Sequence, residues 1–432
     1  RDRHTAMGPV TPAALYSGAG ATQTPAMSAP SPTYPRLALR LAYGAGGAVY
    51  AIKEAAYTMF ILLFYTQVLG LSGSITGVII AVSLVWDAVS DPLVGTLSDR
   101  LRHRHGRRYP FLVWSIVPLG IGYLGLFWPP VAILDSTALL AGWLLFWSLW
   151  VRTFVTTFSV PHLALSTDIT SDYFGRSRIL GARLAFVFLF AVLMPAAALL
   201  FIFPAENGTD GRFLRENYIY YGAFSCVASW LMASITPLFT RSSAISSLER
   251  KGLPSRQANS LTRDLLRTLH NRSFRYLMAS DISMMMGFGC FSTLNMLIWT
   301  YYWEFDAQSV SIILSAPSLL AVALMAVTLG HLSRRFEKYH LLQLAFLGMI
   351  LNCLWLYPMR YLGWLPENGT PLIFWLNFIF MAVFMYCFLM RTIQNQSIIA
   401  DVSDEHDVCL LYTSPSPRDK IHDLVCRRLL EK

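Results

Sequence analysis

The sequence predicts an all-α integral membrane protein. Of its 432 residues, 55% are hydrophobic and only 14% are charged, and the mean hydropathy is +0.47. A water-soluble domain could not bury so large an apolar fraction. Apolar runs of roughly 20 residues, long enough to cross a ~30 Å hydrocarbon core as a helix, recur along the chain. Ten such helices are predicted, at residues 44–69, 75–98, 110–129, 137–162, 178–203, 219–240, 275–301, 309–330, 340–359 and 371–394.

Lysine and arginine gather in alternate connections between these helices. A net charge of +9 would suggest a nucleic-acid partner for a soluble protein, but here the basic residues stand in loops between apolar runs. The loops after the second, sixth and eighth helices are rich in them, and the opposite loops are poor. The positive-inside rule then places these loops and the N-terminus in the cytoplasm. The expected surroundings are the bilayer of the plasma membrane or of an organelle, with no nucleic-acid partner.

Composition divides the chain into five parts. Residues 1–36 are rich in Pro, Ala, Ser and Thr and are predicted to form a disordered tail. Residues 37–241 hold six predicted helices, 242–274 form a basic loop, and 275–407 hold the other four. The stretch CLLYTSPSPRD looks like translated adaptor sequence, so 408–432 is predicted to be a non-native or disordered tail. A genuine cytoplasmic tail on a ten-helix protein is the alternative.

Two weak internal matches indicate a repeat. The segment that begins at Gly95 resembles the one that begins at Gly330, an offset of 235 positions. The segment at Asp168 resembles the one at Asp401, an offset of 233 positions. Nearly equal offsets on corresponding helices indicate parallel halves. Twelve helices are therefore expected in the full-length protein, in two bundles of six, and the second bundle here is incomplete.

Charged side chains inside the predicted helices are the candidates for function, because a charge in the bilayer costs a few kcal/mol. Asp87 and Asp91 lie four residues apart and so on one face of a helix. Carboxylates this close do not both stay ionised unless a cation lies between them or one binds a proton, as in a Na⁺ or H⁺ coupling site. The helical rise places Lys53 and Arg152 near the same level. A static ion-pair network is the alternative. Other charges inside predicted helices are Glu54, Arg183, Asp281 and Arg391.

The loop after the second helix carries the most specific motif. It closely resembles GxxxDRxGRR, the loop signature of the major facilitator superfamily, with extra residues between its two parts. We assign its residues to conformational gating, with a glycine that permits close helix approach, an aspartate that caps a neighbouring helix, and arginines that stay at the cytoplasmic surface. These residues are Gly95, Asp99, Arg100, Gly106, Arg107 and Arg108.

The wider stretch from Trp86 to Phe111 resembles the glycoside-pentoside-hexuronide:cation symporter family. The resemblance implies a major facilitator fold and cation-coupled symport of a sugar or glycoside-like solute by alternating access, without enzymatic activity. It implies that Asp87 and Asp91 bind the coupling ion, Na⁺ or H⁺, and that Arg183 faces the sugar. We expect no other cofactor and no bound metal centre, a small-molecule substrate, and a monomer. Glu54 is a further coupling candidate, and Lys53 and Arg152 are further substrate-binding candidates.

The fourth helix departs from the melibiose carrier, the best-known member of that family. In place of an acid and an aromatic platform that contacts sugar, this chain has Ser159-Val-Pro-His-Leu163. A sodium-linked lysolipid symporter is therefore an alternative, and a non-transporting membrane receptor or scaffold is an alternative from another class. Within this segment His162 is predicted to be a surface histidine. Trp299 and Trp303 are predicted to be residues of the aromatic belt at the membrane interface.

Overall fold

The computed structural model describes residues 36–101, 108–169, 173–205, 209–251 and 272–411. Among them are ten helices long and apolar enough to cross a membrane, one on each predicted apolar run. The first comprises α1 (Leu37–Ala55) and its continuation through η1 (Ala56–Phe60), α2 (Ile61–Leu63) and η2 (Phe64–Val68). The other elements are α3 (Gly73–Arg100), α4 (Tyr109–Phe127), η3 (Val131–Ile133), α5 (Thr137–Ile169), α6 (Tyr173–Ala197), η4 (Ala198–Ile202), η5 (Gly211–Phe213), α7 (Arg215–Lys251), α9 (Arg272–Leu297), η6 (Ile298–Tyr302), α10 (Ala307–Arg335), α11 (Lys338–Cys353), α12 (Leu356–Tyr361) and α13 (Pro371–Leu411).

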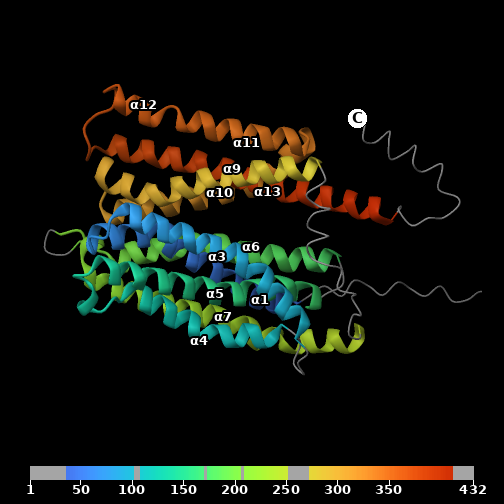
Figure 1. Cartoon of the computed structure of the whole chain (residues 1–432). Coiled ribbons are helices and arrows are strands. Elements are labelled where there is room, and N and C mark those ends of the chain that lie inside the picture. Colours follow the sequence, from blue (N-terminus) through green and yellow to red (C-terminus); the bar gives the residue numbers. More distant parts are fainter. Residues whose placement is uncertain (1–35, 102–107, 170–172, 206–208, 252–271, 412–432) are drawn as a thin grey trace, which may run out of the picture.

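The helices form two groups that lie side by side. Figure 1 shows α1 and α3 to α7 packed together, and α9 to α13 packed along one side of them. Helix α1 packs against α6 and α7, whereas α13 packs against α10 and α11. The two groups meet along α6 and α10, where the Ser311 hydroxyl donates to the Ala196 carbonyl at 3.2 Å. We call the groups the first and second bundles.

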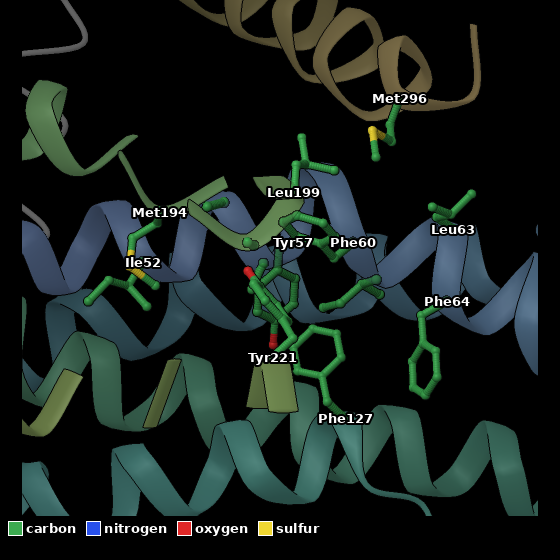
Figure 2. Close-up of a cluster of buried hydrophobic side chains, with 14 of the residues drawn as sticks. Ile52, Tyr57, Phe60, Leu63, Phe64, Phe127, Met194, Leu199, Tyr221 and Met296 are labelled. Carbon is green, nitrogen blue, oxygen red and sulfur yellow. The ribbon is translucent and has the colours of Figure 1, made fainter. Parts of the chain in front are cut away.

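Near one end, both bundles contribute to a continuous apolar core. Phe60, Phe127 and Tyr221 pack there within the first bundle, and Met296 reaches the same core from the second (Figure 2). Trp299 and Trp303 are fully buried in this core. The prediction that these two tryptophans belong to an interfacial belt is therefore wrong. The Trp303 ring lies against Tyr302 and Tyr357 of the second bundle, at centroid distances of 5.1 and 6.1 Å, and the position of a residue along its helix does not reveal such burial.

The same turn follows the first helix of each bundle. Each turn has one residue with positive φ, Gly70 at 73° and Glu304 at 55°. The amide of the next residue bonds to the carbonyl six positions earlier, at 2.8 Å in the first turn and 2.9 Å in the second. The side chains of Ser72 and Asp306 then cap the next helix, each accepting from an amide three residues on. Glu304 lies 234 positions after Gly70, and Asp306 lies 234 positions after Ser72. This offset falls between the offsets of 233 and 235 seen in the sequence.

Three helices cross the predicted boundaries between the parts of the chain, and one of them, α9, begins at Arg272 inside the predicted loop 242–274. Helix α7 continues to Lys251, inside the segment 242–274 that was predicted to be a loop. Helix α13 continues to Leu411, past the predicted end of the second bundle at 407. The length of an apolar run indicates only the part of a helix that crosses the hydrocarbon layer. The backbone hydrogen bonds of the helix can continue outside that layer. Residues 252–271 of the predicted loop, 1–35 of the first predicted tail and 412–432 of the second lie outside the described residues.

Candidate functional site

Four charged side chains from three helices meet inside the first bundle. Lys53 Nζ on α1 lies 3.4 Å from Glu54 Oε2 and 3.9 Å from Asp87 Oδ2 on α3. Arg152 on α5 donates through Nη1 to the same Asp87 oxygen. The side chains of Lys53 and Arg152 are only 8% and 2% exposed, whereas that of Asp87 is 23% exposed. The structure therefore brings together Lys53, Asp87 and Arg152, which helical depth placed at one level, and adds Glu54 to them; Asp91, expected at the same level, lies outside this group. We call Lys53, Glu54, Asp87 and Arg152 the ion cluster.

Two tyrosines on the first helix support the cations of this cluster. The Tyr50 ring lies beneath the Lys53 ammonium, with 4.6 Å from Nζ to the ring centroid. The Tyr57 ring faces the guanidinium of Arg152, 4.5 Å from Cζ, and its hydroxyl donates to the Ser148 carbonyl at 3.1 Å. A cation over an aromatic face is stabilised by the ring quadrupole, and of these two rings only that of Tyr57 is buried. Sequence reasoning missed both tyrosines, although their spacing of three and four residues from Lys53 puts all three on one helix face.

Asp91 has a different environment from Asp87, although both belong to α3. Asp91 is exposed, and its Oδ1 accepts a hydrogen bond of 2.8 Å from the Thr156 hydroxyl. The Ser90 hydroxyl lies 3.4 Å from the same threonine oxygen. Within the part of the chain that the structure describes, no basic group lies within 4.0 Å of the Asp91 carboxylate. The two carboxylates thus divide into one that contacts two cations and one that accepts a hydrogen bond from a single hydroxyl group.

The charges of this region do not balance. Lys53 and Arg152 supply two positive charges, whereas Glu54, Asp87 and Asp91 supply three negative charges when ionised, and among the described residues Arg183 lies within 4.0 Å of none of these carboxylates. The sum is one negative charge, which is costly at membrane depth. A sodium ion or a proton at Asp91 would remove that excess. Carboxylate and hydroxyl oxygens are suitable groups for either.

Arg183, on α6, lies beside α1 but outside the ion cluster. A Cβ atom added to Gly47 would stand 2.6 Å from the Arg183 carbonyl oxygen and 3.0 Å from its Cγ, so a glycine is needed for this approach. The Arg183 side chain is half-buried, and its Nε has no hydrogen-bond partner among the described residues. An unpaired guanidinium donor is a group that a polar substrate could satisfy.

His162 is fully buried, so its prediction as a surface residue is wrong. Its Nε2 lies 2.9 Å from the Tyr43 carbonyl oxygen, and its ring stacks on those of Tyr43 and Phe158 at centroid distances of 4.4 and 5.5 Å. Gly46 makes room for the imidazole, because a Cβ there would stand 2.5 Å from Nε2. The close approach of α1 buries the ring. The group of glycines at positions 44, 46 and 47 was the available signal.

The motif after α3 ties three helices together at the end of the bundle opposite the Gly70 turn. The Arg108 Nη2 atom lies 3.1 Å from Asp99 Oδ1, and its Nη1 donates to the Ala164 carbonyl of α5. Asp99 thus contacts the arginine that precedes α4. Arg108 is buried, contrary to the prediction that it stays at the surface, because it reaches inward to this carbonyl.

The other motif residues have simpler surroundings. Arg100 is exposed, as predicted. A Cβ atom added to Gly95 would meet Val160 Cγ1 at 3.6 Å, an ordinary contact, so the predicted close helix approach at Gly95 is wrong. Gly106 and Arg107 lie outside the described residues.

Two helical bundles with matching turns and an ion cluster inside the first bundle are the arrangement expected of the major facilitator fold. Residues 42–408 match the family described as MFS/sugar transport protein. The chain therefore belongs to this family and is a multi-pass integral membrane protein. The glycoside:cation symporter resemblance and the all-α fold are both confirmed.

Two curated relatives are named as symporters of different substrates. A 134-residue segment, 31% of the chain, is 40% identical to the glycoside/cation symporter YagG of Escherichia coli (strain K12). A 136-residue segment, also 31% of the chain, is 35% identical to the sodium-dependent lysophosphatidylcholine symporter 1-A of Danio rerio. These segments span 28% and 24% of the two relatives' lengths.

Solved structures of a major facilitator protein share this fold. The xylose transporter XylE from E. coli, in a partially occluded inward-open conformation, superposes with a TM-score of 0.57 at 15% sequence identity. The alignment covers 84% of this chain and 87% of that one.

Proposed function

We propose that this protein is a secondary active transporter that couples a Na⁺ or H⁺ gradient to the uptake of a small solute. The observation that carries the proposal is the division of the two carboxylates on α3. Asp87 is neutralised by Lys53 and Arg152, whereas Asp91 faces only the Thr156 hydroxyl among the described residues. The coupling ion binds at Asp91, and no other cofactor is required.

The excess negative charge explains how ion binding drives the transport cycle. A carrier must close its site on one side before it opens on the other, and closure withdraws the carboxylate of Asp91 from water. An uncompensated charge makes that step unfavourable. The bound cation removes the penalty, so the loaded carrier changes state more readily than the empty one.

Asp87 holds the substrate-binding cations in place rather than binding the ion alone. Its carboxylate contacts both Lys53 and Arg152, and the Arg152 Nε has no hydrogen-bond partner among the described residues. Together with Arg183 these groups supply donors for hydroxyl or phosphate oxygens. Glu54 contacts Lys53, and its side chain is 41% exposed, so it can join the ion site when Lys53 moves to the substrate.

A sugar or glycoside is the proposed substrate, and a lysolipid is the second candidate. The name of the E. coli relative supports the first, and the name of the zebrafish relative supports the second. One structural observation favours the lipid. The stacked rings of Tyr43, His162 and Phe158 are fully buried, so this part of α5 offers no free aromatic face for a sugar ring. Uptake of a labelled disaccharide and of a labelled lysophosphatidylcholine, measured in parallel, decides between them.

Proteoliposome uptake under an imposed Na⁺ or pH gradient tests the coupling site. Asp91→Asn is expected to abolish cation-stimulated uptake, because the amide neither carries the charge nor binds a proton. Thr156→Val is expected to raise the half-maximal cation concentration about tenfold, since it removes one oxygen from the site. Asp135→Asn, an exposed change between α4 and α5, is the matched control and should behave as wild type. Unchanged stimulation in Asp91→Asn would overturn the assignment.

The same measurement tests the non-transporting alternative. A receptor or scaffold would bind ligand without moving it, so wild-type proteoliposomes would accumulate neither labelled solute under any gradient. Gradient-dependent accumulation of either solute supports the carrier.

A further inference from the structure

Polar side chains cross between the two bundles at the end that carries the Gly70 and Glu304 turns. Arg212 lies there, on η5 in the connection between α6 and α7, and its side chain is only 1% exposed. A charged group is rarely buried so completely unless it is fully paired. We call this end, with Arg212, Thr300, Tyr301 and Phe305, the closed end.

On one side the guanidinium is fixed to the first bundle. Arg212 Nε lies 3.0 and 2.9 Å from the two carboxylate oxygens of Asp210, and Nη2 donates to the second of them. The Arg212 amide also donates to Asp210 Oδ1 at 2.9 Å, and its carbonyl accepts from the Tyr218 hydroxyl at 2.8 Å. These contacts all belong to the first bundle, so they can persist when the bundles move apart.

On its other side the same guanidinium reaches the second bundle. Nη1 donates to the Thr300 hydroxyl at 2.8 Å, and Nη2 donates to the Phe305 carbonyl at 2.6 Å. Thr300 lies on η6. Glu304, which has a positive φ, is the residue directly before Phe305. A left-handed turn at a non-glycine residue costs about 1 kcal/mol or more and persists only where its surroundings enforce it. Here the turn lies directly before one acceptor of the arginine.

The two sets of contacts have different fates if the closed end opens. Separation of the bundles breaks the bonds to Thr300 and Phe305, which are charge-assisted and therefore stronger than neutral ones. It leaves the ion pair with Asp210 intact, so the positive charge is never stranded. The bridge thus favours the closed arrangement without making its release prohibitively costly.

We propose that Arg212 is the latch of the closed end and sets the fraction of molecules in which this end is open. The inference rests on the proposed function, in that a carrier must open this end during each cycle. It predicts that weakening the bonds to the second bundle raises the open population, whereas changes confined to the first bundle do not.

Arg215, three residues further along, provides the matched control. Arg215 also lies at the closed end and also donates to a backbone carbonyl. Its Nη2 donates at 2.7 Å to the carbonyl of Pro129, which belongs to the first bundle. Thr300→Ser is the conservative control, because it keeps the hydroxyl that accepts from Arg212. Thr300→Val removes the hydroxyl at nearly constant volume and leaves the charge pair untouched.

The test is a distance measurement by pulsed electron spin resonance on the full chain in nanodiscs. Spin labels are placed on cysteines introduced at Leu139 and Leu372, exposed positions at the starts of α5 and α13, with the native cysteines replaced by serine. The ratio of long to short distances is expected to rise about tenfold in Thr300→Val and further in Arg212→Gln. Thr300→Ser and Arg215→Gln should match wild type.

Wild-type distances in both Thr300→Val and Arg212→Gln would overturn the proposal. If Arg212→Gln fails to fold, Thr300→Val decides alone, since it keeps the Asp210 pair. A shift in Arg215→Gln equal to that in Arg212→Gln would also overturn it. The experiment needs neither substrate nor coupling ion. A failed latch therefore shows in the distances, whereas a failed coupling site shows only in the uptake assay.

Discussion

The Tyr301 hydroxyl donates a hydrogen bond to Gln67 Oε1 at 2.7 Å. The two residues are 234 positions apart, the offset that separates Gly70 from Glu304 and Ser72 from Asp306. In an assembly of two related copies, a residue contacts its own equivalent where the symmetry axis passes. The approximate twofold axis that relates the bundles therefore passes between Gln67 and Tyr301, at the closed end.

The shared turn predicts opposite effects of substitution at its two copies. Gly70→Ala introduces a Cβ at a φ of 73° and should lower the unfolding free energy by about 1 kcal/mol. Glu304→Gly removes the strain of a non-glycine residue whose φ is 55°. It should leave the unfolding free energy unchanged or raise it by a few tenths of a kcal/mol. Thermal unfolding in detergent measures both changes. A stabilised Gly70→Ala, or a Glu304→Gly as destabilised as Gly70→Ala, would contradict this account.

The two carboxylates of α3 should differ in their contribution to stability. Asp87→Asn leaves the buried Lys53 with Glu54 as its partner and removes the carboxylate that pairs with the buried Arg152. Breaking a buried ion pair costs about 3–5 kcal/mol, and the partial exposure of Asp87 places the expected loss near the lower value. Asp91→Asn removes an unpaired charge and should be neutral or stabilising. Fluorescence-detected melting of both variants tests this order, and a lower melting temperature for Asp91→Asn than for Asp87→Asn would contradict it.

The glycines of the chain should separate into tolerant and intolerant positions. Gly46→Ala would place a methyl group 2.5 Å from His162 Nε2 and 2.6 Å from the Thr236 hydroxyl oxygen, so α1 must shift away from its neighbours. We expect a loss of about 1–3 kcal/mol, as for other overpacked cores. Gly95→Ala is the matched control, because its methyl group would make only an ordinary contact, and helix propensity favours alanine. The yield of monodisperse protein and its melting temperature measure the difference between the two variants. Equal values for Gly46→Ala and Gly95→Ala would contradict the prediction.

A second intramembrane ion pair joins α9 to α13. Arg391 donates to Asp281 Oδ1, and Asn395 Nδ2 lies 3.1 and 2.9 Å from the two oxygens of the same carboxylate. Asp281→Asn should destabilise the second bundle because it leaves a buried arginine unpaired. The double variant Asp281→Asn with Arg391→Met should recover most of the loss. A double-mutant cycle on unfolding free energies is expected to show a coupling of about 2 kcal/mol, and additive effects would show that the pair contributes nothing specific.

Much of the candidate site could be anticipated from the sequence. The positions of Lys53, Asp87 and Arg152 along their helices predicted a common depth, and the structure joins them. The unequal surroundings of Asp87 and Asp91 could not be anticipated, because both lie on one helix and differ only in what α1 and α5 present to them. His162 was misjudged for the same reason. Its burial depends on the glycines of another helix, 115 or more positions away.

The sequence by itself determined the ten membrane helices, the family and the internal repeat, because each depends on properties of neighbouring or regularly spaced residues. Hydropathy over one segment decides whether that segment crosses a bilayer, whatever lies beside it. Only the tertiary structure decided that Arg212 bridges the bundles, that Tyr301 contacts its own equivalent, and that Asp91 lacks a basic partner among the described residues. Those contacts depend on how helices rotate and approach one another, which side-chain packing fixes and local composition does not.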